Sequence, residues 1–242
     1  MTAAELIDAF RARVTDQTAP YLWSDEEVQE FLDDAHNEAV ERSSGIRDSA
    51  TAAICTIAVT AGVADYDLSN RVLSVERAKL DNRNLPLELT STAEMDRGTS
   101  MRVRDWRSSY PGYLSSNQTG SGWEQQEGQP KYLVLEFDRA RWRAKLAPIP
   151  TESDTLRLQV YRLPLVSLTD DLEPEIAFRL HIRLVDWMEF RAYSKKDSET
   201  NDEAKAARAA AVFEGAFGAR IDANVRRKQL ENYPNTTVFR EF

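Results

Sequence analysis

Two helices are predicted at the start of the chain, because apolar residues recur there every three or four positions. The first covers residues 3–14, and its apolar stripe consists of Leu6, Ile7, Phe10 and Val14. The second follows Ser24, which has Glu27 three positions later. A serine and a glutamate at this spacing form a capping box, in which each side chain satisfies a backbone N–H group of the first turn. The sequence therefore predicts a helix that begins directly after Ser24.

Helical spacing returns after Pro174, a residue suited to the first position of a helix. The apolar stripe of this third helix consists of Ile176, Leu180, Leu184, Trp187 and Met188. A fourth, alanine-rich helix is expected from Thr200, which forms a second capping box with Glu203, to about Leu230. Residues 232–242 contain a proline and several β-branched residues, so we expect this tail to be extended.

Between the helical regions the pattern is typical of β-strands, with β-branched and apolar residues alternating with polar ones. The expected strand segments are AICTIAVTAG, RVLSVERAKL, KYLVLEF, RWRAKLA and TLRLQVYRL, and a turn is expected at ADYDLSN. The short turn DRA between KYLVLEF and RWRAKLA predicts a hairpin. Residues 108–130 are rich in Ser, Gly, Gln and Pro without periodicity, which predicts a long exposed loop.

The arrangement of these segments predicts an α+β protein with a discontinuous helical part. The helices at each end of the chain cannot bury their apolar stripes alone, so we expect both ends to build one bundle of about four helices. This bundle would comprise residues 1–48 and 172–231. A β-rich domain of sandwich-like or barrel-like form, residues 49–171, would be inserted between them, and residues 232–242 would form a tail.

Composition and charge narrow the classes of function. The chain of 242 residues has a net charge of −9, whereas surfaces that wrap nucleic acid collect Lys and Arg to neutralise phosphates. No run of about 18 apolar residues occurs, so we expect no membrane span. Cys55 is the only cysteine in the sequence, which excludes an internal disulfide bond and a cysteine-rich zinc site.

Asp33 and His36 are the pair that most resembles a metal-binding element. A carboxylate three residues before a histidine on a helix occurs in di-iron bundles, but such sites need a second element of this kind and two further carboxylates. The only other histidine, His181, lacks a carboxylate at that spacing. Asp33 lies on the polar face of its predicted helix, so we interpret the stretch as a solvated helix that binds no metal.

Catalytic motifs are also missing from the sequence. Cys55 lies in an apolar, strand-like run without a basic neighbour, which favours a buried, inert thiol. No Gly-x-Ser-x-Gly sequence occurs, and Gly120-Ser-Gly122 lacks the Lys-Ser or Lys-Thr pair of a phosphate-binding loop. We therefore predict no catalytic residue, no cofactor and no enzyme activity.

Aromatic residues outside the periodic segments are candidates for contact surfaces. In and beside the predicted loop these are Trp106, Tyr110, Tyr113 and Trp123. They either mark a contact surface or fold back onto the β-rich domain. The tail carries the apolar anchors Tyr233, Val238, Phe239 and Phe242. Such an extended tail is either frayed or bound to another chain by strand addition or pocket insertion, and we favour binding.

The order of these segments resembles the head-to-tail connector, or adaptor, proteins of tailed bacteriophages. The resemblance is carried by LWSDEEVQEFLDDAHNEAVERS, ADYDLSNRVLSVERAKLD, LAPIPTESDTLRLQVYRLPL, and EPEIAFRLHIRLVDWMEFRAYSKKDSET followed by AAVFEGAFGARI. Together these segments span most of the chain. The long loop rich in Gly and Gln departs from the better-known members of the family.

The resemblance implies a structural virion protein at the portal vertex, assembled in the host cytoplasm. In such adaptors a helical bundle carries a β-rich insertion, and twelve copies form a ring under the portal that continues the DNA channel and receives the tail. The implied partners are the portal protein, a tail nozzle or terminator protein, and further copies of the chain. DNA would pass through the channel during genome ejection without specific binding, and no membrane is involved.

The resemblance also assigns contacts to residues. Portal binding falls to the tail, with Tyr233, Pro234, Val238, Phe239 and Phe242 as its contacts. Tail-side contacts fall to the β-rich domain and to Trp106, Tyr110, Tyr113 and Trp123. A closed ring needs two different faces on each subunit, and the predicted helix 200–230 is a candidate for one of them.

Two alternatives remain at the level of the sequence. One is a tail-terminator or minor tail protein, and the other is a small-molecule enzyme built on Asp33 and His36. An acidic channel lining, which repels DNA and so avoids trapping a passing genome, favours the adaptor.

Overall fold

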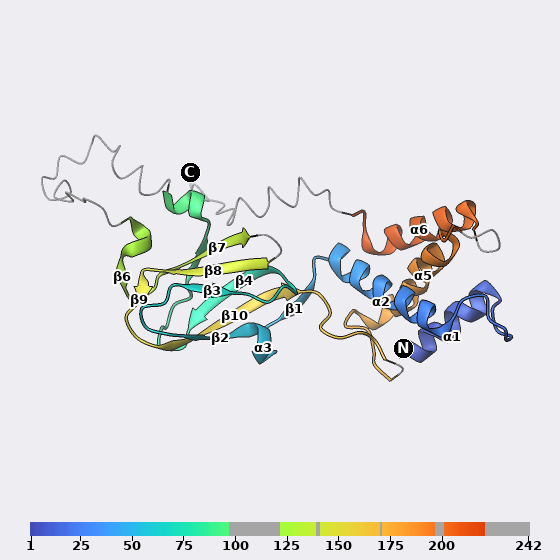
Figure 1. Ribbon diagram of the computed structural model, residues 1–242, viewed down its shortest axis with the longest axis horizontal. Coiled ribbons are helices and arrows are strands. Elements are labelled where there is room, and N and C mark those ends of the chain that lie inside the picture. Colours follow the sequence, from blue (N-terminus) through green and yellow to red (C-terminus); the bar gives the residue numbers. More distant parts are fainter. Residues whose placement is uncertain (97–121, 139–140, 170, 197–200, 221–242) are drawn as a thin grey trace, which may run out of the picture. The chain divides into compact units, whose positions relative to one another are not determined.

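The computed structural model describes residues 1–96, 122–138, 141–169, 171–196 and 201–220 (Figure 1). The chain divides into two compact units. The helical unit contains Met1–Ile46 and Arg162–Ile221, and the β unit contains Arg47–Tyr161. Helices from both ends of the chain and sheets from its middle confirm the predicted α+β class.

The helical unit is built from four α-helices and one 3₁₀ helix among the described residues. These are α1 (Ala3–Val14), α2 (Asp25–Arg42), η2 (Phe178–Arg183), α5 (Leu184–Tyr193) and α6 (Glu203–Phe217). Side chains from all four α-helices meet in one core, which includes Phe10, Leu32, Met188 and Phe213. Burial of each such side chain contributes roughly 1.5–3 kcal/mol relative to exposure, which is why both chain ends pack together.

Capping boxes begin the first two helices. Ser24 Oγ accepts a hydrogen bond from the N–H of Glu27 at 3.2 Å, and the Glu27 carboxylate accepts one from the N–H of Ser24 at 3.1 Å. The predicted capping box is therefore confirmed. Thr2 and Glu5 form an equivalent box at the start of α1. Both helices begin where the side chains satisfy their first free N–H groups.

The last two predicted helices begin later than the apolar pattern indicates, and the fourth also ends earlier. The third was expected at Pro174, but helical structure begins at Phe178 with η2. The fourth was expected from Thr200 to Leu230, but its cap is Asp202, whose carboxylate accepts from the N–H of Lys205 at 3.0 Å. It ends at Phe217, because Gly218 adopts φ +87°, which does not continue a helix.

The β unit contains ten strands, two short helices and a further helical segment at residues 92–96 among the described residues. The strands are β1 (Ile46–Asp48), β2 (Thr56–Val59), β3 (Asp65–Asp67), β4 (Val72–Leu80), β5 (Glu88–Thr90), β6 (Glu127–Gly128), β7 (Tyr132–Asp138), β8 (Arg141–Ala147), β9 (Ile149–Pro150) and β10 (Asp154–Arg162). The short helices are α3 (Ala52–Cys55) and η1 (Trp123–Gln125).

These strands form two four-stranded sheets and one small pair. In the first sheet β10 pairs with β1, β2 and β4, and the second has the order β3-β8-β7-β5. Strands β7 and β8 form the predicted antiparallel hairpin, with Tyr132 opposite Ala147. The indole N–H of Trp142 in β8 donates to the carbonyl of Leu73 in β4 at 2.9 Å, which links the two sheets. The third sheet pairs β6 with β9.

Two short predicted segments were wrong in the β unit. Ala52–Cys55 is one helical turn instead of a strand, and Cys55 at its end is buried. Asp65–Asp67, expected in a turn, forms β3, with Asp65 opposite Lys145 and Asp67 opposite Arg143 of β8. Opposite charges across an antiparallel pair stabilise a strand that a polar sequence alone does not favour.

Candidate interaction surfaces

One face of α2 holds the segment between β10 and η2, residues 163–169 and 171–177, which we call the strap. The carboxylate of Asp33 accepts from the N–H of Leu168 at 2.8 Å. One turn further along α2, His36 Nε2 accepts from the N–H of Glu175 at 3.0 Å. Gln29, one turn before Asp33, donates to the carbonyl of Leu168. Side chains four and three positions apart share one helix face, so α2 binds the strap at three successive turns.

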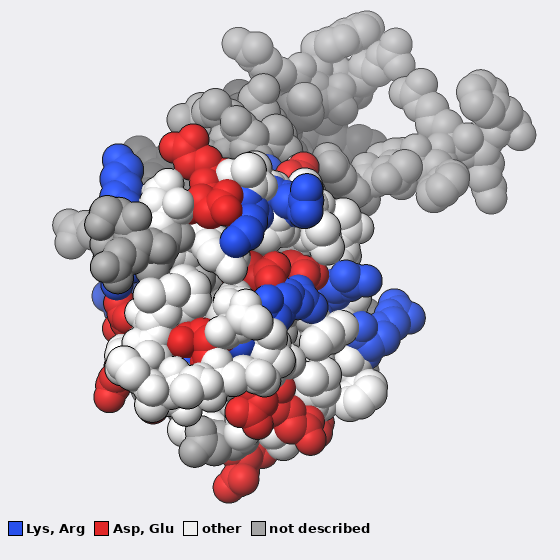
Figure 2. All heavy atoms as spheres, turned by 90° about the vertical axis from the view of Figure 1, so that its right-hand side faces the viewer, with Lys and Arg blue, Asp and Glu red and all other residues white. Residues whose placement is uncertain are grey.

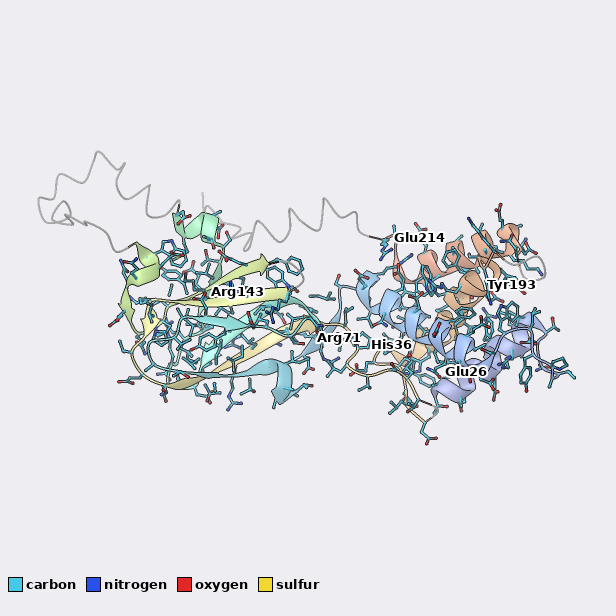
Figure 3. The ribbon with its side chains drawn as sticks, viewed as in Figure 1. Glu26, His36, Arg71, Arg143, Tyr193 and Glu214 are labelled. Atoms are coloured by element: carbon cyan, nitrogen blue, oxygen red, sulfur yellow. The ribbon has the colours of Figure 1, made fainter. Side chains whose placement is uncertain are left out.

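His36, labelled in Figure 3, is buried and acts as a neutral acceptor. Burial lowers its pKa to about 4, although the carboxylates of Glu175 and Asp33 act in the opposite direction. The interpretation of this stretch as a solvated helix was therefore wrong for these side chains, since Asp33 and His36 bind the strap. Among the described residues, no three His, Cys, Asp or Glu side chains gather as a metal site requires.

An ion pair holds the far end of the strap. Both guanidinium NH groups of Arg162, at the end of β10, donate to the carboxylate of Glu175 at 2.9 Å. Arg162 is buried, and its hydrogen bonds are the main reason that the pKa of Glu175 is lowered. A bidentate pair of this kind fixes orientation as well as distance. The strap is thus fixed at Leu168 by α2 and at Glu175 by α2 and by Arg162.

Some of the exposed side chains of the strap are large and apolar. Val166 is 64% exposed and Leu172 is 40% exposed, and Phe178, the first residue of η2, is 71% exposed. The ring of Phe178 lies against the ring of His181 at 5.3 Å between centroids. We call Val166, Leu172 and Phe178 the strap surface. Exposed apolar groups of this size on one segment are typical of contact surfaces.

Helix α6 presents a second surface. Its inner side buries Phe213 and Phe217. Its outer side carries exposed Ala204, Ala207, Arg208, Ala211, Val212 and Glu214, and Glu214 is labelled in Figure 3. At the start of the helix, Lys205 lies 4.8 Å from the ring centre of Tyr193 on α5 and 3.5 Å from the Asp202 carboxylate.

A polar network at the end of α6 fixes where the chain leaves the helical unit. Arg42 of α2 pairs with Glu38 at 2.9 Å and donates to the carbonyl of Gly218 at 3.1 Å. Its guanidinium also lies 5.0 Å from the ring centre of Trp187 and close to that of Phe213. Cation–π contacts of this kind add to the ion pair. Residues 219 and 220 therefore follow a fixed end of α6.

In the β unit, Trp123 packs against the chain's own residues. Its indole N–H donates to the Asp96 carboxylate at 2.9 Å, and the amine of Lys145 lies 5.4 Å from its ring centre. Lys145 also pairs with Glu124 at 2.9 Å. The other predicted contact residues lie outside the described residues; these are Trp106, Tyr110, Tyr113, Tyr233, Pro234, Val238, Phe239 and Phe242.

Charge is distributed unequally between the two units. The sequence ranges of the helical unit contain 22 Asp and Glu against 12 Lys and Arg, whereas Arg47–Tyr161 contains 15 of each. The net negative charge of the chain thus belongs to the helical unit. Figure 2 shows a face on which acidic and basic side chains alternate among uncharged ones. None of the described helices is both long and apolar enough to cross a membrane.

A family model described as SU10 adaptor protein matches residues 1–238, which include both units and nearly the whole chain. No curated protein matches the chain.

Proposed function

We propose that this chain, which belongs to the SU10 adaptor protein family of phage head-tail adaptors, forms a ring that joins the portal to the tail. The match over residues 1–238 carries the proposal, and it confirms the family that the sequence resembled. The chain is thus a structural phage protein and a component of the virion. We propose that it acts by assembly, without catalysis.

In this proposal about twelve copies surround the DNA channel at the portal vertex. A ring continues the portal on one side and meets a nozzle or terminator protein of the tail on the other. The excess of carboxylates in the helical unit supports a channel that repels the phosphates of passing DNA. We also propose that the helical bundle, residues 1–48 and 172–231, and the insertion, residues 49–171, act as two functional domains.

The tail of the chain is proposed as the portal contact. Residues 232–242 carry Tyr233, Pro234, Val238, Phe239 and Phe242, which suit insertion into pockets or addition to a sheet. The fixed end of α6 at Gly218 supports this role, because it gives the following residues a defined starting point. Trp106, Tyr110 and Tyr113 are proposed as tail-side contacts, and Trp123 as the residue that supports the base of their loop through Asp96.

Native mass spectrometry of the protein, alone and mixed with purified portal ring, tests the function. We expect a 27.5 kDa monomer that joins the portal ring in about twelve copies. A monomer or small oligomer that does not bind portal would overturn the proposal and favour a tail terminator or minor tail protein.

A truncated chain tests the role of the tail. The variant that lacks residues 232–242 is expected to keep the circular dichroism spectrum of the full chain and to lose portal binding. Phe137→Ala provides a matched control, since it removes an exposed aromatic side chain from the β unit and should leave portal binding unchanged. Undiminished binding by the truncated chain would place the portal contact elsewhere.

A further inference from the structure

The strap surface is held rigidly, although its side chains are exposed. The N–H groups of Leu168 and Glu175 are bound by Asp33 and His36, and Leu168 itself is buried in the helical core. The exposed side chains at Val166, Leu172 and Phe178 therefore stand on a fixed backbone. A surface ordered in advance loses little conformational freedom on binding, which favours association.

Two residues of the strap surface lie beside the first residues of the chain. The N–H of Ala3 donates to the carbonyl of Leu172 at 2.9 Å. The ring of His181 lies within 3.2 Å of the carbonyl of Met1 and stacks against Phe178. The first residues of the chain thus contact the backbone of Leu172 and the ring of His181, which lies against Phe178.

The outer face of α6 is the second surface. Among the described residues, no other segment covers it. Val212 on this face is 41% exposed, and the exposed alanines Ala204, Ala207 and Ala211 precede it. A Cβ atom added at Gly215 would meet nothing within 4 Å, so this end of the face is also open. In Figure 1, α6 runs along the upper side of the helical unit and the strap along its lower side. The strap and α6 therefore lie on opposite sides of the same unit.

The charges beside the two surfaces are complementary. Asp171 precedes Phe178 and Arg179 follows it, whereas Arg208 precedes Val212 and Glu214 follows it on α6. All four charged side chains are exposed. None of the four makes an ion pair within the described parts of the chain. The order of sign is reversed between the surfaces, so two copies whose surface segments run in the same direction place acid against base at both ends of an apolar contact.

We propose that the strap surface of one copy packs against the outer face of α6 of the next copy in the ring. This inference rests on the proposed ring and names its subunit interface. Opposite faces of one unit that complement each other make a heterologous contact, and repetition of such a contact closes a ring when the rotation between copies allows it. A second copy of this chain is thus the occupant that the charges and the placement of both surfaces favour.

Cross-linking between engineered cysteines tests the interface. Phe178→Cys and Val212→Cys are placed in separate chains that carry Cys55→Ala, so that each has one thiol. The two variants are mixed, assembled on portal ring and treated with a short bismaleimide. We expect covalent dimers in the mixture and none in either variant alone, because a heterologous contact brings together two different positions. One chain that carries both cysteines should give a ladder of higher oligomers.

The outcomes separate this interface from the proposed function. Ala12→Cys, at an exposed position of α1, replaces Phe178→Cys in the control mixture and should give no dimers with Val212→Cys. If native mass spectrometry finds the ring on portal but the test mixture gives no dimers, the interface is wrong and the adaptor function stands. Dimers in a single-variant sample would indicate an isologous contact and overturn the interface. If the wild-type chain forms no ring, both proposals fail.

Discussion

At the scale of single residues, His36 shows how burial decides the protonation of a side chain. The residue is 2% exposed, and its Nε2 accepts a hydrogen bond from the backbone N–H of Glu175, which requires that this nitrogen carry no proton. The pKa is lowered from 6.5 to about 4 in the folded chain, so the unfolded chain binds more protons between these values. The free energy of unfolding contributed by this residue is therefore complete above pH 6.5 and is lost as the pH falls towards 4.

This loss predicts the behaviour of His36→Gln. A glutamine oxygen can accept from the same N–H but does not titrate. When the pH is lowered from 7 to 5, the free energy of unfolding should therefore fall by about 2 kcal/mol less in the variant than in the wild type. Urea unfolding at several pH values between 5 and 7 measures the difference. This interval lies above the range in which most carboxylates titrate. Parallel pH profiles for the two proteins would contradict the role of His36.

Sequence spacing predicted the capping box of Ser24 and Glu27 because both partners lie within one turn. It could not predict the partners of Asp33 and His36. Their hydrogen bonds reach residues 135 and 139 positions away in the chain. Helical periodicity tells which residues share a face, but it does not tell whether another segment covers that face. The pattern of α2 therefore predicts a solvated polar face, although the strap lies on it.

At the scale of elements, the end of α6 is decided by one glycine. Apolar residues continue at helical spacing through Ile221 and Val225, which is why the sequence predicted a helix to Leu230. Gly218 adopts φ +87° and ψ 171°, a combination that is almost restricted to glycine. Gly218, a glycine at the end of a periodic segment, was the signal in the sequence for the helix end. The apolar spacing that continues after it favoured a longer helix.

Substitution of two glycines by alanine should have opposite effects on stability. Gly218→Ala is expected to lower the free energy of unfolding by about 1–3 kcal/mol, because a Cβ atom is strained in that conformation. Gly215→Ala lies inside α6, where the new Cβ meets nothing within 4 Å. It should raise the free energy of unfolding by roughly 0.5–1 kcal/mol. Urea unfolding measures the free energy of unfolding of both variants. Changes of the same sign in the two variants would be inconsistent with the observed end of α6.

At the scale of the whole molecule, the β unit is joined to the helical unit at two neighbouring strands. The chain enters at β1 and leaves at β10, which are hydrogen-bonded neighbours in one sheet. The side chains of Arg47 and Gln159 lie within 3.0 Å of each other. The strand periodicity of β4, β7, β8 and β10 was sufficient to predict an inserted sheet region. Pairings of strands with two or three residues, such as β6 with β9, carry too little pattern to be predicted.

Residues 47–161 should fold without the helical unit. The β unit has its own buried side chains, among them Leu133, Trp142 and Leu156, and it is compact by itself. We expect the isolated fragment to show a strand-rich circular dichroism spectrum and a single cooperative unfolding transition in urea. A fragment that unfolds without cooperativity would show that the helical unit is needed to complete its core.

The neighbouring positions of β1 and β10 also bear on how the chain tolerates changes in length. The whole insertion connects the two parts of the helical unit, and its two ends are already held together by the pairing of β1 with β10. The entropy of closing a connection depends on the separation of its ends and rises only slowly with added residues. Residues gained or lost inside the insertion should therefore hardly affect the folding of the helices. We expect the inserted part to vary in length between related chains more than the helical part does.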